Sequence, residues 1–235
     1  MQQYFVDVWH GRLALEAEEV QRSAGVLNDS ERQKAQAFKL PLMRDRYIAV
    51  RVLLRRTLAG YLHADPADLA FEIGEHGKPR LACGSLHFNL SHSGDSLIIA
   101  VADFPDIGID IESIKPRASL ESIARRCFSD REFERWQLLP EAERTKTFYR
   151  LWTKKEAFVK AVGRGIALGL EQCEVELEEG GDLLVVPTEY GPATAWKAIE
   201  LPVDASTCAA LVTANCRFVL RRLELEAAGL RAAFS

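Results

Sequence analysis

The segment Phe104-Pro105-Asp106-Ile107-Gly108-Ile109-Asp110-Ile111-Glu112 divides the chain into two halves that each hold long helices and several strands. Apolar and polar residues alternate from 107 to 112, which predicts a β-strand because successive side chains of a strand point to opposite faces. Pro105 and Asp106 provide a break just before this strand. We therefore predict two units, residues 1–104 and residues 105–235.

The N-terminal half reads as a strand, then helices, then further strands. Alternation predicts a strand over residues 4–8, and Asn28 offers N-cap chemistry for a helix that extends to about Phe38. Pro41 is expected to interrupt the helical stretch, and a long helix is expected to follow over residues 44–61. Strands are expected at 69–73, 86–90 and 97–102, with Ser91-His92-Ser93-Gly94 as a turn.

The second half repeats this organisation. One helix is expected over residues 120–127, and a second is expected to begin at the capping box of Ser129. A third is expected over residues 141–162, where Gly163 or Gly165 would end it. The tail from Glu224 to Ser235 is expected to be helical or loose. Closing strands are expected at 174–177, 183–186, 194–201, 208–214 and 218–223. Helices clustered between strands that can pair as hairpins predict an α+β fold and not a doubly wound parallel sheet.

Composition excludes several classes of protein. The 235 residues are 48% hydrophobic and 27% charged, with a formal net charge of −4. This balance excludes a disordered chain and argues against a dedicated nucleic-acid binder. No apolar run reaches the ~18 residues of a membrane span, and the N-terminus does not resemble a signal peptide. Five cysteines without a C-x-x-C pair indicate reduced thiols, so we expect a cytoplasmic protein that binds neither nucleic acid nor membrane.

Two carboxylates in the quoted segment are candidates for a metal site. Asp110 and Glu112 are two residues apart in the expected strand, so their side chains project from the same face. Adjacent carboxylates repel each other unless a divalent cation or a shared proton relieves them. The alternative is a solvated face of an edge strand, which is the more common reason for alternating acids.

The segment Trp152-Thr153-Lys154-Lys155-Glu156-Ala157-Phe158-Val159-Lys160 carries a second candidate group. On a helix, Trp152, Glu156 and Lys160 share one face. Glu156 could be a third metal carboxylate, with Lys160 as a phosphate contact. A surface ion pair, worth only about 0.2–0.5 kcal/mol, would equally explain the Glu156–Lys160 spacing.

Phosphate-binding groups are scattered through the first half. Ser91 and His92 could hold a phosphate at the end of a strand, and Gly77-Lys78-Pro79-Arg80 would present Lys78 from a turn. Lys34, Arg44, Arg46 and Arg51 add positive charge. Solvated helix charges and an ordinary loop are the alternative explanations. From the residues alone, the chain is an α+β protein with a possible three-carboxylate metal site beside phosphate-binding groups.

The order of these motifs carries a family resemblance. G-K-P at residues 77–79, F-N-L-S-H-S at 88–93, G-I-D-I-E at 108–112 and W-T-K-K-E-A-F-V-K at 152–160 follow one another along the chain. This combination resembles the 4′-phosphopantetheinyl transferase superfamily, and specifically its long surfactin-synthetase-activating type, the Sfp type. The resemblance extends from about residue 34 to residue 169.

The resemblance implies a fold and a reaction. It implies two similar α/β subdomains in a pseudo-twofold arrangement, with coenzyme A in the cleft between them. It also implies transfer of the 4′-phosphopantetheine arm to a serine of an acyl or peptidyl carrier protein, with release of adenosine 3′,5′-bisphosphate. Asp110, Glu112 and Glu156 would hold Mg²⁺, and Glu156, or else Glu112, would be the general base. The residues expected to contact coenzyme A are Lys34, Arg46, Arg51, Lys78, Arg80, Ser91, His92, Lys155 and Lys160.

A carrier protein is expected to dock through opposite charge. Carrier proteins of this family are typically acidic around the modified serine, so a basic face is expected on the enzyme. Lys115, Arg117, Arg125 and Arg126 follow the predicted metal strand and could supply it. The internal duplication suggests a monomer. A non-catalytic coenzyme A-binding module and a Mg²⁺-dependent hydrolase of the coenzyme A diphosphate are the alternatives, and the sequence does not indicate whether the carrier serves fatty-acid, polyketide or peptide synthesis.

Overall fold

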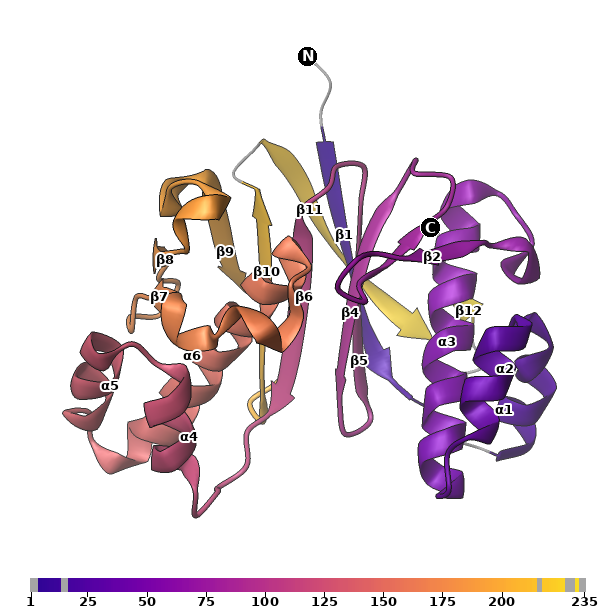
Figure 1. Ribbon diagram of the computed structural model, residues 1–235. Helices are drawn as coiled ribbons and strands as arrows, with labels where there is room; N and C mark the ends of the chain where they lie inside the picture. Colours follow the sequence, from indigo (N-terminus) through magenta and orange to yellow (C-terminus); the bar gives the residue numbers. More distant parts are fainter. Residues whose placement is uncertain (1–3, 14–16, 215–216, 227–230, 233–235) are drawn as a thin grey trace.

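Two 22-residue helices, one in each half of the sequence, organise the fold (Figure 1). Helix α3 spans Pro41–Leu62 and helix α6 spans Glu141–Val162. Pro41 begins α3 instead of interrupting it, because the first helical position needs no N–H donor and suits the fixed φ of proline. The left-handed conformation of Gly163, with φ 74°, ends α6 as predicted.

The computed structural model describes residues 4–13, 17–214, 217–226 and 231–232. The first lobe contains a five-stranded sheet in the order β12-β11-β1-β5-β4. Strand β1 lies in its centre, antiparallel to β5 and parallel to β11. The strands span Tyr4–Arg12 (β1), His87–Ser93 (β4), Ser96–Ala102 (β5), Phe218–Glu226 (β11) and Arg231–Ala232 (β12).

The second lobe contains a three-stranded antiparallel sheet in the order β6-β10-β9. Its strands span Ile107–Ser113 (β6), Trp196–Glu200 (β9) and Thr207–Ala214 (β10). Each lobe also carries a two-stranded ribbon. The ribbons pair Phe71–Ile73 (β2) with Pro79–Leu81 (β3), and Glu174–Val175 (β7) with Leu183–Val185 (β8).

Shorter helices cover the outer side of each lobe. Capping boxes at Asn28 and Ser129 begin α2 and α5, where the sequence predicts an N-cap and a capping box respectively. The shorter α-helices are α1 (Ala17–Ser23), α2 (Asp29–Gln36), α4 (Leu120–Cys127) and α5 (Asp130–Gln137). Single 3₁₀ turns lie at Ala24–Val26, Pro66–Asp68, Gly165–Leu168, Leu170–Gln172, Thr188–Tyr190 and Ala193–Ala195.

Three buried clusters hold these layers together. One lies between the first sheet and α3, and another lies between α4, α5, α6 and the second sheet. The third lies between the two sheets and includes Val6, Ile98, Ile109 and Ile111. The layers are therefore helix, sheet, sheet and helix, which confirms the α+β prediction (Figure 1).

Strand pairing differs from the sequence prediction at three places. Residues 91–93 continue β4, and the hairpin turn is only Gly94-Asp95 because Ser93 pairs with Ser96. Strand β11 lies in the first sheet, although the predicted unit 105–235 contains it. The tail is not helical where it is described, since 224–226 and 231–232 are strand, while 227–230 and 233–235 lie outside the described residues.

No helix within the described residues is both long enough and apolar enough to cross a bilayer. The four described cysteines, Cys83, Cys127, Cys173 and Cys208, are free thiols, as predicted. Cys216 lies outside the described residues.

Candidate functional site

Gly108 sets the distance between strand β6 and helix α6. A Cβ atom at this position would lie 2.0 Å from the carbonyl oxygen of Ala157 and 2.3 Å from the backbone nitrogen of Ala161. Only glycine permits this approach. The contact places the last two turns of α6 directly against β6. Side chains at 110 and 112, which share the face of residue 108, therefore lie beside α6.

Asp110 and Lys160 form the centre of the candidate site. The Lys160 Nζ atom lies 2.7 Å from Asp110 Oδ1 and also donates to Ser91 Oγ and the Ile109 carbonyl. The Ser91 hydroxyl donates to the same Asp110 oxygen at 2.7 Å. Asp110 is buried, and its second oxygen, Oδ2, has no hydrogen-bond partner. An unpartnered buried carboxylate oxygen is costly, so this atom is available to accept from a ligand.

Glu112 and Glu156 complete a group of three acids. Both are partly buried. Burial raises the pKa of each side chain, and the negative charge of Asp110 raises it further. Glu112 also raises the pKa of Glu156, so the three acids repel one another across the gap between β6 and α6. Burial likewise raises the pKa of Asp110, although Lys160 opposes that shift.

These residues fit a divalent cation by their chemistry. Oxygen ligands from several carboxylates are what Mg²⁺ prefers, and a cation would relieve the mutual repulsion just described. Among the described residues, however, no three ligand side chains stand close enough together to hold a metal as they are. The ammonium group of Lys160 lies on Asp110 and supplies the positive charge there.

Basic groups face the acids from the first lobe. Arg46 on α3 pairs with Asp95 in the β4–β5 turn, at 2.8 Å. Burial lowers the pKa of His92, and the nearby charges of Arg46 and Lys160 lower it further. Lys34 is exposed on α2, with its Nζ atom 5.5 Å from the centre of the Tyr47 ring. Ser91, His92 and Arg46 thus lie within reach of Lys160 or of one another, whereas the contact shown for Lys34 is with Tyr47 of α3.

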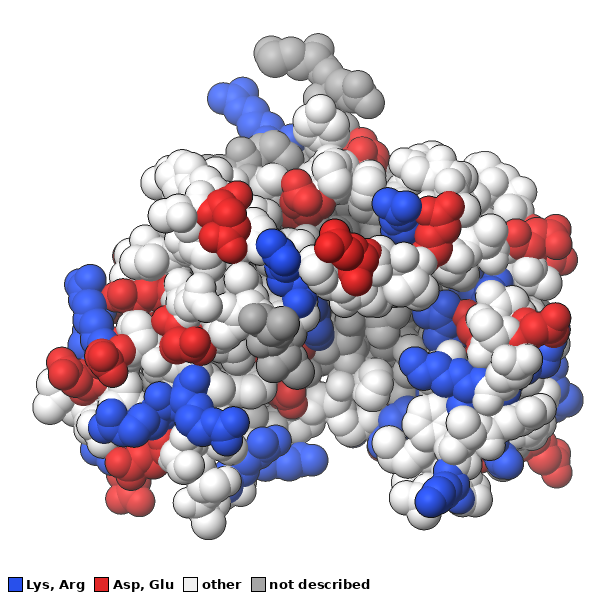
Figure 2. Space-filling model, viewed as in Figure 1, with Lys and Arg blue, Asp and Glu red and all other residues white. Residues whose placement is uncertain are grey.

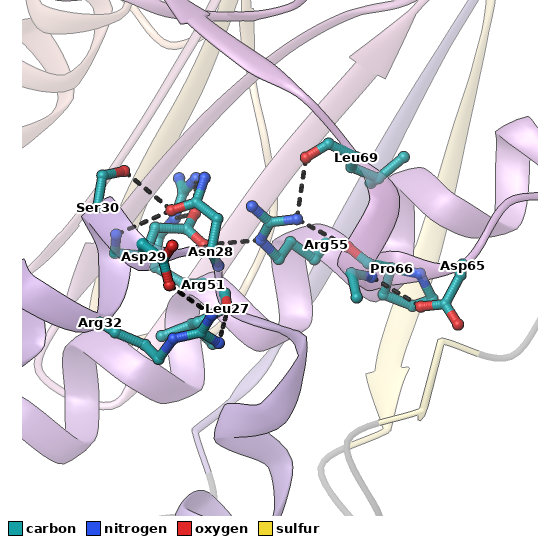
Figure 3. A network of polar contacts seen from close by, with 12 residues as sticks. Leu27, Asn28, Asp29, Ser30, Arg32, Arg51, Arg55, Asp65, Pro66 and Leu69 are labelled. Atoms are coloured by element: carbon teal, nitrogen blue, oxygen red, sulfur yellow. Dashed lines mark hydrogen bonds and ion pairs between the residues drawn. The ribbon is translucent and has the colours of Figure 1, made fainter.

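Arg51 is held within a structural network (Figure 3). Its Nε atom donates to Glu31 Oε1 at 2.6 Å, and the fully buried Arg55 donates to the other oxygen of Glu31 at 2.7 Å. Both guanidinium groups lie 5.0 Å from the centre of the Phe71 ring. This network ties α2 to α3, so Arg51 supports the helix that carries Lys34. Arg80 forms an exposed ion pair with Glu72 across the β2–β3 ribbon.

Lys78 joins the two lobes. Its Nζ atom lies 2.9 Å from both the Ile107 and the Ala161 carbonyl oxygens of the second lobe. A pocket of about 350 Å³ lies beside it, lined in part by His87, Asp106 and Gly163. Burial lowers the pKa of Lys78 to about 8. The lysine of the G-K-P motif is therefore placed at the seam between the lobes, where the charge of Asp106 opposes the effect of burial on its pKa.

We expect the stability contributed by Lys78 to depend on pH. Because the folded pKa of about 8 lies below the ordinary 10.5, the unfolded chain binds the proton more tightly. Burial of the charged Lys78 side chain therefore lowers the free energy of unfolding by its full amount below pH 8. This destabilisation disappears as the pH rises from 8 toward 10.5. The free energy of unfolding of the wild type, relative to that of Lys78→Met, should therefore rise by about 2 kcal/mol between pH 7 and pH 9.5. Urea denaturation of both proteins at the two pH values measures this difference, and a constant difference would contradict it.

Lys155 does not lie with the other predicted residues. It is fully buried on the side of α6 that faces α4 and α5. Its Nζ atom lies 2.5 Å from Glu132 Oε2 and also donates to the carbonyls of Cys127, Leu170 and Cys173. The structure thus gives this lysine a structural place and no access to a ligand. Lys154 is equally buried, against Glu200 and the Gly181 carbonyl.

The surface is hollowed between the lobes, in the lower half of Figure 2. This hollow lies between β4 and β6, the strands that carry Ser91, Ser93, Asp110 and Glu112 (Figure 1). Blue side chains gather on both sides of it. The predicted docking residues are all exposed: Lys115, Arg117, Arg125 and Arg126.

Sequence reasoning missed Ser93 and Asn89. Ser93 donates to Glu112 Oε2 at 2.9 Å, and Asn89 Oδ1 accepts from the Ile109 N–H at 2.9 Å. The sequence does indicate them, because residues 89, 91 and 93 are polar and lie two apart, as side chains on one face of a strand do. Placing residues 91–93 in a turn concealed that alternation.

Comparisons with known proteins identify the family of the chain. Residues 106–212 match the model of the 4′-phosphopantetheinyl transferase superfamily, and residues 15–103 match that of the 4′-phosphopantetheinyl transferase N-terminal region. The chain is 38% identical over 214 residues to 4′-phosphopantetheinyl transferase HetI of Nostoc sp., which covers 89% of this chain and 88% of that protein. It is 36% identical over 180 residues to 4′-phosphopantetheinyl transferase Sfp of Bacillus subtilis, covering 76% and 79% of the two chains.

Proposed function

Because the chain belongs to the 4′-phosphopantetheinyl transferase superfamily, and within it to the Sfp type, we propose that it transfers 4′-phosphopantetheine from coenzyme A to a serine of an apo carrier protein. Membership of this family makes it a transferase. The observation that supports the proposal is the Asp110–Lys160 ion pair at the gap between β6 and α6, with Glu112 and Glu156 near enough for the charge of Asp110 to raise their pKa values. Magnesium dependence, a monomeric enzyme and a cytoplasmic location are parts of the same proposal.

Three carboxylates would hold the magnesium ion: Asp110, Glu112 and Glu156. A bound Mg²⁺ would supply Lewis-acid stabilisation of charge on the diphosphate oxygens. The unpartnered Oδ2 atom of Asp110 supports this assignment, as does the repulsion that raises the pKa values of Glu112 and Glu156. Lys160 would then turn its charge toward the phosphate oxygens, where negative charge develops during transfer.

The proposed step forms one P–O bond and breaks another. The serine oxygen of the carrier attacks the phosphorus that bears the pantetheine arm, and the bond from that phosphorus to the bridging diphosphate oxygen breaks. Adenosine 3′,5′-bisphosphate leaves with the bonding electrons. Glu156 accepts the serine proton, and its raised pKa makes it a stronger base than an ordinary carboxylate. Glu112, whose pKa is also raised, is the second candidate for the base.

One incubation tests the reaction. The full chain is mixed with coenzyme A, Mg²⁺ and an apo acyl or peptidyl carrier protein, and the products are examined by mass spectrometry. The carrier should gain the mass of the phosphopantetheine arm, and omission of Mg²⁺ should prevent the gain. Hydrolysis of coenzyme A without modified carrier would instead support the hydrolase alternative. An unchanged carrier together with intact coenzyme A would support a binding module.

Charge reversal on α4 tests how the carrier docks. Arg125 and Arg126 are exposed, and acidic carriers should be attracted to them. The double variant Arg125→Glu, Arg126→Glu should raise the KM for the carrier at least about tenfold, because like charges then meet at the interface. Coenzyme A affinity, measured by calorimetry, should stay within about twofold.

The matched control is Arg222→Glu on β11, an exposed arginine of the first sheet. This variant should leave both constants unchanged. Weaker coenzyme A binding in the double variant would contradict the docking assignment, because it would place the α4 arginines in the nucleotide site.

A further inference from the structure

Strands β4 and β6 meet as two sheet edges without a backbone ladder. Each is the last strand of its own sheet. Side chains of β4 replace the missing ladder: Asn89 Oδ1 accepts from the Ile109 N–H at 2.9 Å, and Ser93 Oγ accepts from the Ser113 N–H at 3.0 Å. The contacts advance along both strands in the same direction, so the edges run parallel.

The polar side chains at residues 89, 91 and 93 of β4 face this junction. Asn89 and Ser91 pair with Ala100 and Ile98 of β5, whose side chains lie in the cluster between the two sheets. Residues 89, 91 and 93 alternate along the strand, so they project from the same face toward the second lobe. The first lobe therefore supplies the groups that fix the edge of β6.

Ser93 makes two contacts with adjacent residues of β6. Its hydroxyl accepts from the Ser113 N–H and donates its only proton to Glu112 Oε2, at 2.9 Å. The backbone bond fixes the position of the hydroxyl, and the hydroxyl in turn fixes the carboxylate. Two residues earlier on β4, the Ser91 hydroxyl likewise donates to the Asp110 carboxylate, and it accepts a hydrogen bond from Lys160 Nζ.

We propose that Ser93 is a positioning residue that holds the Glu112 carboxylate toward the cation site. The inference rests on the proposed function, since it concerns the cation that Asp110, Glu112 and Glu156 would bind. Glu112 has three rotatable bonds and lies near the exposed end of β6, with Asp110 repelling it. Without Ser93, the carboxylate gains rotamer freedom and turns toward water, so a bound cation must then restrict its rotamers. Outer groups that orient metal ligands commonly change metal affinity by about 10–100-fold.

The test uses Mn²⁺ as the probe and the full chain as the sample. Electron paramagnetic resonance measures free and bound Mn²⁺ directly, without any turnover. Ser93→Ala should raise the Mn²⁺ dissociation constant by about 10–100-fold. Ser93→Thr keeps the hydroxyl and should restore affinity to within about threefold of the wild type, a recovery that a mere packing role would not produce.

Ser96→Ala is the matched control. Ser96 is the β5 partner of Ser93 in the same hairpin and is the more buried of the two, but the Ser93–Glu112 hydrogen bond does not involve it. It should bind Mn²⁺ as the wild type does, and thermal unfolding of both alanine variants should show that each remains folded.

Two results would overturn the inference in different ways. Equal Mn²⁺ affinity of the wild type and a folded Ser93→Ala variant would remove the positioning role and leave the proposed function intact. Absence of Mn²⁺ binding by the wild type would remove the cation site itself, and with it both the positioning role and the magnesium part of the proposed function.

Discussion

Replacing Glu156 with glutamine is expected to slow transfer to the carrier by about 10²- to 10⁴-fold without lowering thermal stability. The rate falls because glutamine cannot accept a proton and is a poorer cation ligand. Stability is kept because burial and the charges of Asp110 and Glu112 disfavour the ionised carboxylate in the folded protein. A neutral side chain of the same shape removes that repulsion. Single-turnover transfer measured by mass spectrometry, with thermal unfolding of the same sample, checks both parts.

Glu143→Gln provides the control for this experiment, because Glu143 is an exposed acid in the first turn of the same helix. It should leave transfer within about twofold of the wild type. Near-normal turnover by Glu156→Gln would remove the three-carboxylate site from the proposal. A marked loss of stability would show instead that the Glu156 charge is favourable in the folded chain.

The second large effect is expected on stability, from Lys155→Met. This change removes the cation that faces Glu132 inside the C-terminal lobe and leaves a buried carboxylate unpaired. Breaking a buried pair in this way costs about 3–5 kcal/mol. For a chain of this size that corresponds to about 6–20 °C in Tm. Coenzyme A affinity, measured at a temperature where the variant is folded, should stay unchanged because Lys155 has no exposed surface.

Lys146→Met offers the comparison on the same helix. Lys146 pairs with Glu179 at the surface, where both side chains are well exposed. Such pairs contribute about 1 kcal/mol or less, so Tm should change little. A Lys155→Met protein that melts normally but binds coenzyme A weakly would restore the ligand role that the sequence resemblance gives to this lysine.

The acids of the site could be found from the sequence because their spacing is local. Alternation places Asp110 and Glu112 on one face of a strand, and a four-residue interval places Glu156 and Lys160 on one face of a helix. Gly108 then determines how closely that strand and helix approach, and its role appears only when the packing is known. Local periodicity thus predicted the groups, while the tertiary contact created the site.

The two adjacent lysines illustrate what periodicity cannot supply. Lys154 and Lys155 occur in a polar-looking motif, and lysines in such a motif are usually solvated. Their acidic partners are distant in sequence, Glu200 for Lys154 and Glu132 for Lys155, and full burial is tolerable because these acids and backbone carbonyls receive the ammonium groups. The parallel pairing of β11 with β1 was missed for a similar reason, since strand periodicity identifies a strand but not its neighbour.

The return of β11 to the first sheet has a consequence for dissecting the polypeptide. Cleavage in the connection between Ala102 and Ile107 would not yield two autonomous pieces, because the later piece carries the neighbour of β1. Produced by itself, the earlier piece would present a bare edge along Tyr4–His10, and bare edges of this kind recruit other chains. Co-expression of both pieces should therefore be needed to recover soluble material, as in a split protein reconstituted by strand complementation.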